Sequence, residues 1–226
     1  MTYYVTANEG DTRDFEFFSE EERIKDLDLD PTIFPNASEL QQDENLGRLK
    51  VTSILSDLDD DGLYDKLFSF GARSFSIWDS FGNLVFDSGD RFEERIANNI
   101  PRRFNSDNED NDSFDSRSDY KGPEPEAIAI GGIGQKTYAF IGLERIGGII
   151  VYNVSNPQAP KFTQYINNRR FNVDTEVDGA PNPAARDLGP ESIIFISAGD
   201  SPNRKPLVVV GNEISGTTTI FEINNN

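Results

Sequence analysis

Short apolar runs that end in small residues and then a charged residue occur four times along the chain. They read YYVTANEG, LFSFGARS, YAFIGLER and LVVVGNEI, at residues 3–10, 67–74, 138–145 and 207–214. The charged positions, Glu9, Arg73, Glu144 and Glu213, follow one another at intervals of about 70 residues. Runs of β-branched and aromatic residues bounded by turn residues are typical of strands. A repeat of this length is typical of folds in which each unit buries its apolar face against the next one.

The second half of the chain shows the repeated unit most clearly. After Glu126, four short apolar runs (AIAIGGIGQ, KTYAFIGLER, GGIIVYNV and KFTQYI) are joined by turns rich in Gly, Pro and Asn, and a similar series follows Glu191. Such turns connect antiparallel strands into a meander. A repeated antiparallel sheet of about four strands is the blade of a β-propeller. The sequence therefore predicts an all-β fold of about three to four propeller blades, which form an incomplete part of a larger ring.

The repeat divides the chain into one partial β-propeller of four segments. These are a blade stub at residues 1–46 and blades at residues 47–122, 123–186 and 187–226. The aromatic residues predicted to lie in the core between blades are Phe75, Trp78 and Phe86.

Two insertions, residues 14–46 and 91–122, interrupt the blades and are predicted to contain short helices. In the first, SEEERIKDL begins at Ser19 with a residue type that caps helix N-termini and with acids in its first turn. In the second, RFEERIANNI predicts a helix within residues 91–105, before a stretch rich in Asn, Asp and Ser. That stretch is either a mobile loop or part of a binding face, since insertions in repeat folds commonly gather on one face.

The chain is strongly acidic, with a net charge of −19 from 40 Asp and Glu against 21 Lys and Arg. A surface of this sign repels phosphate backbones, so we expect no nucleic-acid partner. The sequence has no Cys, which excludes disulfides and thiol chemistry, and no His, which excludes Ser-His-Asp hydrolysis and His-built zinc or iron sites. No apolar run is long enough to span a membrane. Any chemistry must therefore rely on carboxylates, Lys, Arg, Tyr, Ser or Thr, with or without a hard cation.

The most specific local motif is DLDDDGLYD at residues 57–65. Alternating carboxylates followed by Gly match the first half of a calcium loop, in which side-chain oxygens converge on one ion. The predicted metal ligands are Asp57, Asp59, Asp61, the backbone carbonyl of Leu63, and Asp65. The twelfth position, where a helix–loop–helix site has a bidentate Glu, is Phe68, so we predict a calcium loop in a β-hairpin instead. The alternative is a solvated acidic turn, whose four carboxylates would repel one another.

The charged residues at the strand ends predict a second candidate site, because equivalent positions of successive blades converge near the axis of a propeller. The channel-mouth ligand candidates are Glu9, Arg73, Arg117, Asp119, Lys121, Glu126, Glu144, Glu191 and Glu213. The catalytic candidates in or beside this set are Arg73, Glu144, Arg145 and Glu213. One interpretation is a site for a divalent cation, a phosphate ester or another polar ligand. The other is structural, with each Glu capping its neighbouring blade through backbone N–H groups or an arginine.

Several long strings resemble the choice-of-anchor I domain, a β-propeller family of mesenchyme-specific cell-surface glycoproteins and many bacterial extracellular proteins. These strings are YVTANEGD, LGRLKVT, FGARSFSIWD, LVFDSGD, YAFIGLERIGGIIVY, DLGPE and VVGNEISGTT. The resemblance runs almost from end to end and implies a secreted or surface-attached propeller. Bacterial members often carry an alkaline phosphatase label or are likened to phytase-type esterases. The chain resembles the C-terminal half of the family domain, so we expect it to lack the opening blades, the secretion signal and the anchor.

Three hypotheses about function follow. The first is a non-catalytic, calcium-stabilised segment of an extracellular or cell-surface binding or adhesion domain. Its partners would be divalent cations, an extracellular polymer or the missing N-terminal half of the propeller. The second is a calcium-dependent phosphate-ester hydrolase, in which bound cations neutralise the phosphate and activate water. The third is a truncated remnant without independent function, for which we expect a broad, non-cooperative melt.

Overall fold

The computed structural model describes residues 1–224 and divides into two compact units. The sheet unit comprises Met1–Asn8, Arg73–Arg117 and the residues from Gly122 onward. The insertion unit comprises Glu9–Ala72 and Ser118–Lys121.

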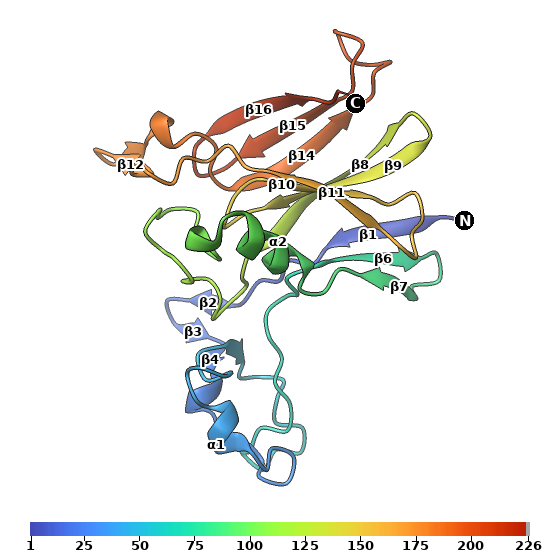
Figure 1. Ribbon diagram of the computed structural model, residues 1–226. Coiled ribbons are helices and arrows are strands. Elements are labelled where there is room, and N and C mark those ends of the chain that lie inside the picture. Colours follow the sequence, from blue (N-terminus) through green and yellow to red (C-terminus); the bar gives the residue numbers. More distant parts are fainter. Residues whose placement is uncertain (225–226) are drawn as a thin grey trace. The chain divides into compact units, whose positions relative to one another are not determined.

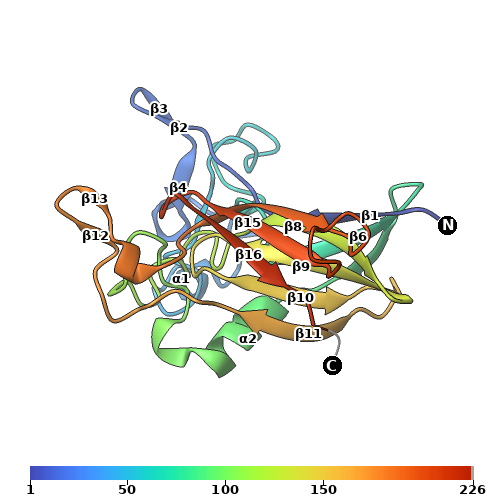
Figure 2. The same ribbon diagram turned by 90° about the horizontal axis from the view of Figure 1, so that it is seen from above.

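The sheet unit contains three antiparallel sheets of three or four strands (Figures 1 and 2). The first, in the order β1-β6-β7, consists of β1 (Tyr3–Ala7), β6 (Phe75–Asp79) and β7 (Leu84–Asp87). The second, in the order β11-β10-β9-β8, consists of β8 (Pro125–Ile133), β9 (Lys136–Leu143), β10 (Ile149–Asn153) and β11 (Lys161–Ile166). The third, in the order β14-β15-β16, consists of β14 (Pro190–Ile196), β15 (Leu207–Asn212) and β16 (Thr217–Glu222).

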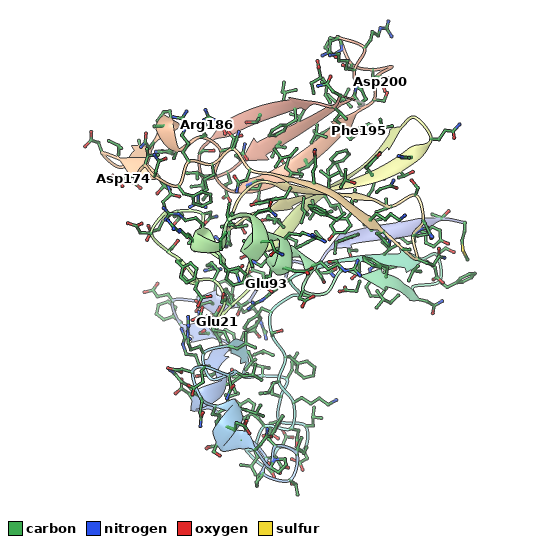
Figure 3. The ribbon with its side chains drawn as sticks, in the orientation of Figure 1. Glu21, Glu93, Asp174, Arg186, Phe195 and Asp200 are labelled. Carbon is green, nitrogen blue, oxygen red and sulfur yellow. The ribbon has the colours of Figure 1, made fainter. Side chains whose placement is uncertain are left out.

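The middle sheet, β8 to β11, is apolar on both faces because side chains alternate along each strand. On one face Ile141 of β9 is fully buried in a cluster that includes Phe75 and Ile77 of β6. On the other face Phe140 lies in a cluster with Val208 and Val210 of β15. Phe140 also stacks on Phe195 of β14, with ring centroids 5.8 Å apart (Phe195 is labelled in Figure 3). The alternation therefore packs this sheet between the other two.

Helix α2 (Arg91–Asn99) completes the first of these cores. Its Phe92 and Ile96 are fully buried, one turn apart on the same face of the helix. Phe92 stacks on Phe75 with centroids 6.0 Å apart, and Tyr152 of β10 lies 4.9 Å from Phe75. The apolar face of this helix thus contributes to the same core as the strands.

The rest of the sheet unit consists of short elements between the strands. They are a 3-10 helix at Pro101–Arg103, the two-stranded sheet of β12 (Glu176–Val177) and β13 (Ala180–Pro181), and a 3-10 helix at Pro183–Ala185.

The insertion unit is built from short strands around a small core of its own. Strands β2 (Asp14–Phe15) and β3 (Phe18–Ser19) pair with each other, and β4 (Glu21–Arg23) pairs with β5 (Lys50–Thr52). A 3-10 helix at Ile24–Asp26 and helix α1 (Ala37–Leu40) complete the unit. The buried residues of its core cluster are Ile24, Leu27, Leu29 and Val51.

The predicted all-β class is confirmed, with several small antiparallel sheets, few short helices, and an arrangement consistent with incomplete propeller blades. The predicted short helices are present as α1 in residues 14–46 and α2 in residues 91–105.

The helix predicted to start at Ser19 is wrong. Residues 21–23 form β4, and only Ile24–Asp26 are helical, as one 3-10 turn. The pairing with β5 places Glu21 opposite Thr52 and within an ion pair to Lys50, while Ile24 is fully buried. Long-range pairing therefore overrides the local capping signal at Ser19.

The second of the four strand signatures is also wrong. Residues 67–74 form no continuous strand, and β6 begins only at Phe75. Gly71 has a φ of +66° and its backbone lies against Gly10, where a Cβ on Gly10 would come within 2.1 Å of the Gly71 nitrogen. This close backbone approach requires glycine and interrupts the extended run.

Strand β1 pairs with β6 along five residue pairs, from Tyr3 opposite Asp79 to Ala7 opposite Phe75. The first sheet therefore combines β1, from the predicted blade stub at residues 1–46, with β6 and β7, from the predicted blade at residues 47–122. The blade boundaries themselves stay a prediction.

Of the predicted core aromatics, Phe75 and Phe86 lie in the core, but Trp78 does not. Trp78 lies on the opposite face of β6 from Ile77 and donates a hydrogen bond to Thr6 Oγ1 at 3.0 Å.

Candidate functional sites

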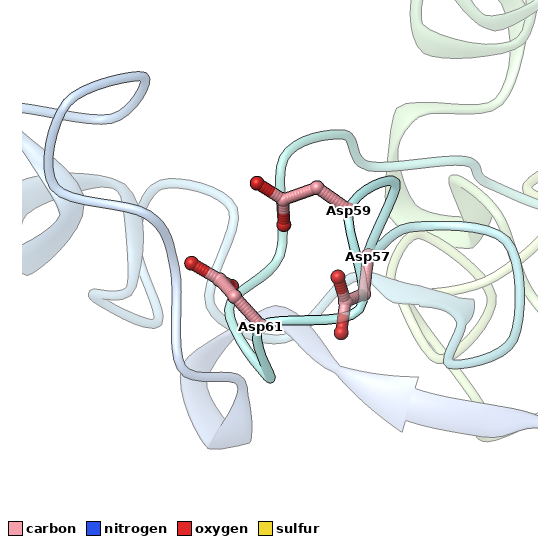
Figure 4. Close-up of side chains that lie close together, drawn as sticks. All are labelled: Asp57, Asp59 and Asp61. Atoms are coloured by element: carbon pink, nitrogen blue, oxygen red, sulfur yellow. The ribbon is translucent and has the colours of Figure 1, made fainter.

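The acidic loop at residues 57–65 brings three carboxylates together within the insertion unit (Figure 4). One carboxylate oxygen from each of Asp57, Asp59 and Asp61 lies within 4.8 Å of the others. Asp57 is half-buried, whereas Asp59 and Asp61 are exposed. The alternating positions that the sequence singled out therefore converge on one point.

Backbone hydrogen bonds hold the loop in this shape. The Gly62 N–H donates to Asp57 Oδ2 at 2.9 Å, and the Leu63 N–H donates to Asp61 Oδ1 at 2.8 Å. Gly62 has a φ of +89°, in the left-handed region that side chains rarely adopt. Asp65 lies outside the group of three, and its Oδ2 accepts from the Leu58 N–H at 2.8 Å. It therefore stabilises the loop through this hydrogen bond.

The electrostatics of the loop favour a cation. The negative charge of Asp61, then burial and the charge of Asp65, raise the pKa of Asp59 above its usual value. Asp57 Oδ1 is buried and has no hydrogen-bond partner among the described residues. An all-oxygen ligand set with converging negative charge suits Ca²⁺, a hard cation that takes carboxylates and carbonyls. The residues present thus fit a calcium ion at Asp57, Asp59 and Asp61.

A second group of charged residues is buried in the sheet unit where β8 begins and β9 ends. Glu124 is 1% exposed and Glu144 is 5% exposed. Arg145 joins them: its Nε lies 2.8 Å from Glu124 Oε2, and its Nη1 lies 3.0 Å from Glu144 Oε1. Burial, then the charge of Glu124, raises the pKa of Glu144 to about 7.

The segment 105–117 contacts these groups through polar and charged side chains. The fully buried Asn108 donates to Glu144 Oε1 at 2.9 Å and accepts from Arg145 Nη1 at 3.1 Å. Arg117 lies 3.3 Å from Glu124 and 3.5 Å from Asp107. The loop and the strand ends therefore form one network.

Arg169, which follows β11, fastens the same segment from another direction. Its guanidinium donates to Asn111 Oδ1 at 2.9 Å, to the Asp107 carbonyl at 2.7 Å and to the Arg145 carbonyl at 2.9 Å. Burial lowers its pKa to about 10. This residue is thus used to satisfy backbone carbonyls rather than to pair with a carboxylate.

The other channel-mouth candidates are distributed over several places. Arg73 pairs with Glu93 of α2 at 2.8 Å, and Glu93 also accepts from Asn105 (Glu93 is labelled in Figure 3). Glu213 is exposed and lines a cavity of 630 Å³ together with Glu109 and Glu176, among others. Glu191 is exposed at the irregularity in β14.

The remaining candidates, Glu9, Asp119 and Lys121, belong to the insertion unit. Asp119 pairs with Arg23 at 2.9 Å, and the buried Lys121 lies 3.9 Å from Glu9. Within the sheet unit, the structure brings together Arg117, Glu126 and Glu144 with Arg145. Glu124 and Arg169 were not among the residues predicted from the sequence, although Glu124 stands two positions before the predicted Glu126.

Comparison with known proteins places the chain in a family. The family model of the choice-of-anchor I domain matches residues 1–157, which include both the acidic loop and the Glu124–Glu144–Arg145 group. The chain belongs to the choice-of-anchor I domain family. The predicted family is therefore confirmed.

Two proteins are similar in sequence to this choice-of-anchor I chain. Gigasin-3a from Magallana gigas is 33% identical over 190 residues, which cover 81% of this chain and 66% of the relative. A mesenchyme-specific cell surface glycoprotein from Strongylocentrotus purpuratus is 28% identical over 110 residues, which cover 41% of this chain and 14% of the relative. The chain thus spans less than two thirds of each relative. No solved structure matches it significantly. Among the described residues, no helix has the length and apolar character needed to cross a bilayer.

Proposed function

We propose that this chain is a non-catalytic binding or adhesion segment of an extracellular or cell-surface protein, stabilised by calcium in the 57–65 loop. The surface assignment is supported by the family match and by the relative named as a cell surface glycoprotein. The proposed partners are divalent cations and an extracellular polymer or protein. Leu63 through its carbonyl, and Asp65 through water, are proposed as additional ligands.

One observation carries the calcium proposal. Asp57 Oδ1 is buried without a hydrogen-bond partner among the described residues, at the point where Asp59 and Asp61 converge. A buried carboxylate oxygen without a partner is costly, and nearby like charges add to that cost. A divalent cation offsets both effects at once, since it supplies a partner for this oxygen and neutralises the repulsion.

Native mass spectrometry of the full chain tests the proposal. After removal of adventitious metal and addition of excess calcium, we expect one bound calcium ion per chain. The variant Asp59→Asn/Asp61→Asn is expected to bind none. The matched control, Asp26→Asn/Asp28→Asn, removes two exposed acids with the same spacing in the same unit and should keep the ion. A calcium-free spectrum of the unmodified chain would end the proposal.

The hydrolase alternative gains no support from the arrangement of the catalytic candidates. Arg73 pairs with Glu93, and Arg145 is occupied by Glu124 and Glu144. We therefore expect no turnover of p-nitrophenyl phosphate by the purified chain in excess calcium. Calcium-dependent turnover that disappears in Arg73→Ala would instead favour the hydrolase.

A further inference from the structure

The buried network at the end of β9 brings several carboxyl and guanidinium groups together. Glu144 interacts with Glu124, Glu126 and Arg145, and Glu124 interacts in addition with Arg117. Several charged groups face this site. Glu124 just precedes β8 and Glu126 lies in it, Arg145 follows β9, Asp107 and Arg117 belong to the segment 105–117, and Arg169 follows β11. Arg169 is directed at backbone carbonyls and at Asn111.

Glu124 is fixed at the centre of this network. Its φ is +52°, a left-handed conformation that is unfavourable for a residue with a side chain. The Glu144 N–H donates to the Glu124 carbonyl at 2.8 Å, and Arg145 binds both Glu124 carboxylate oxygens, at 2.8 and 3.3 Å. The backbone hydrogen bond and Arg145, which binds both residues, therefore hold the two carboxyl groups close together.

We infer that Glu124 and Glu144 form a pH-sensitive clasp, which is closed when the two carboxyl groups share one proton and is weakened when both are ionised. Two like charges this close in a buried site cannot both ionise without cost, whereas a shared proton forms a hydrogen bond between them. Asn108 fastens the segment 105–117 directly to Glu144. Ionisation of Glu144 strengthens that single hydrogen bond, because a carboxylate is the better acceptor, but it adds repulsion against Glu124, to which Arg117 of the same segment is attached. This repulsion destabilises the network that holds the segment, whose Glu109 and Asp110 line the 630 Å³ cavity.

The direction of the pH dependence follows from the pKa of Glu144, which is about 7 in the folded chain against an ordinary value of 4.5. A raised pKa in the folded state means that the folded chain binds this proton more tightly than the unfolded chain does. The stability that it contributes is fully present below pH 4.5 and is lost as the pH rises through about 7. The clasp is therefore closed at mildly acidic pH and weakened above neutrality.

Carbon-13 NMR of the glutamate side chains in the full chain, at constant calcium concentration, tests the inference directly. The carboxyl resonance that is absent from Glu144→Gln identifies Glu144, and we expect it to titrate with a midpoint near 7. A midpoint near the ordinary value of 4.5 would overturn the inference. Should the variant not fold, assignment of Glu144 in the unmodified chain through its backbone gives the same midpoint.

Stability and hydrogen exchange supply the second readout. Between pH 5.5 and pH 8 we expect the folding equilibrium constant of the unmodified chain to fall by about tenfold or more relative to Glu144→Gln. Exchange in residues 105–117, corrected for its intrinsic pH dependence, should rise over the same range. Glu213→Gln is the matched control, since Glu213 follows β15 as Glu144 follows β9 but is exposed. Equal pH dependence in Glu144→Gln and the unmodified chain would contradict the clasp.

Discussion

Chelation of calcium is expected to lower the melting temperature of the chain by about 5–10 °C. A ligand at about a hundred times its dissociation constant stabilises a protein by roughly 2.7 kcal/mol, and each kcal/mol shifts the midpoint of a domain this size by about 2–4 °C. The physical reason is that the carboxylates of Asp57, Asp59 and Asp61 lie close together and repel one another. A bound calcium ion neutralises this repulsion, and chelation restores it. Differential scanning calorimetry with calcium and with chelator measures the difference.

The variants separate a specific site from a general effect of charge. Asp59→Asn/Asp61→Asn should melt at the same temperature with and without calcium. The control Asp26→Asn/Asp28→Asn should retain the full calcium effect, although it removes the same net charge. A chelator effect that survives in the first variant would mean that calcium acts elsewhere.

Removal of Arg145 is expected to produce the largest loss of stability of any single charged residue in the network. Arg145→Ala leaves two buried carboxylates, Glu124 and Glu144, without their shared guanidinium. Breaking a buried ion pair from one side typically costs about 3–5 kcal/mol. Urea unfolding of the variant should therefore show a clearly lower midpoint at an unchanged slope.

An exposed ion pair provides the comparison for Arg145. Lys205 pairs with Glu222 at the surface, with side chains 50% and 36% exposed. Lys205→Ala should cost at most about 1 kcal/mol, since solvent screens such pairs. Adding Glu124→Gln to Arg145→Ala should recover part of the loss, because it removes one of the stranded charges. Equal losses of stability for Arg145→Ala and Lys205→Ala would show that the buried network stabilises the chain no more than an exposed ion pair does.

The strands that the sequence predicted well are those whose burial follows from their own alternation. Residues 138–145 lie mainly in β9, where Phe140 and Ile141 face two different cores, and residues 207–214 lie mainly in β15. The run at residues 67–74 failed because Gly71 approaches the backbone of Gly10, a contact between positions far apart in the chain. The helix at Ser19 failed for the same kind of reason, since β4 pairs with β5.

The two candidate sites differ in how far sequence could predict them. The acidic loop is contiguous, so its alternation alone was enough to predict that Asp57, Asp59 and Asp61 converge. The buried network joins residues such as Arg145 and Glu124, or Arg169 and Asn111, which meet only after the strands pair. A burial as complete as that of Glu124 is not expected for a Glu between two prolines, and no local pattern indicates it.

Isothermal titration of calcium into the metal-free chain tests the central claim most directly. We predict saturable binding of one ion per chain, with a dissociation constant on the order of 10⁻⁴ M or below, as for extracellular calcium modules. The Asp59→Asn/Asp61→Asn variant should give no heat of binding above dilution. Absence of binding to the unmodified chain at millimolar calcium, or undiminished binding to that variant, would contradict the account.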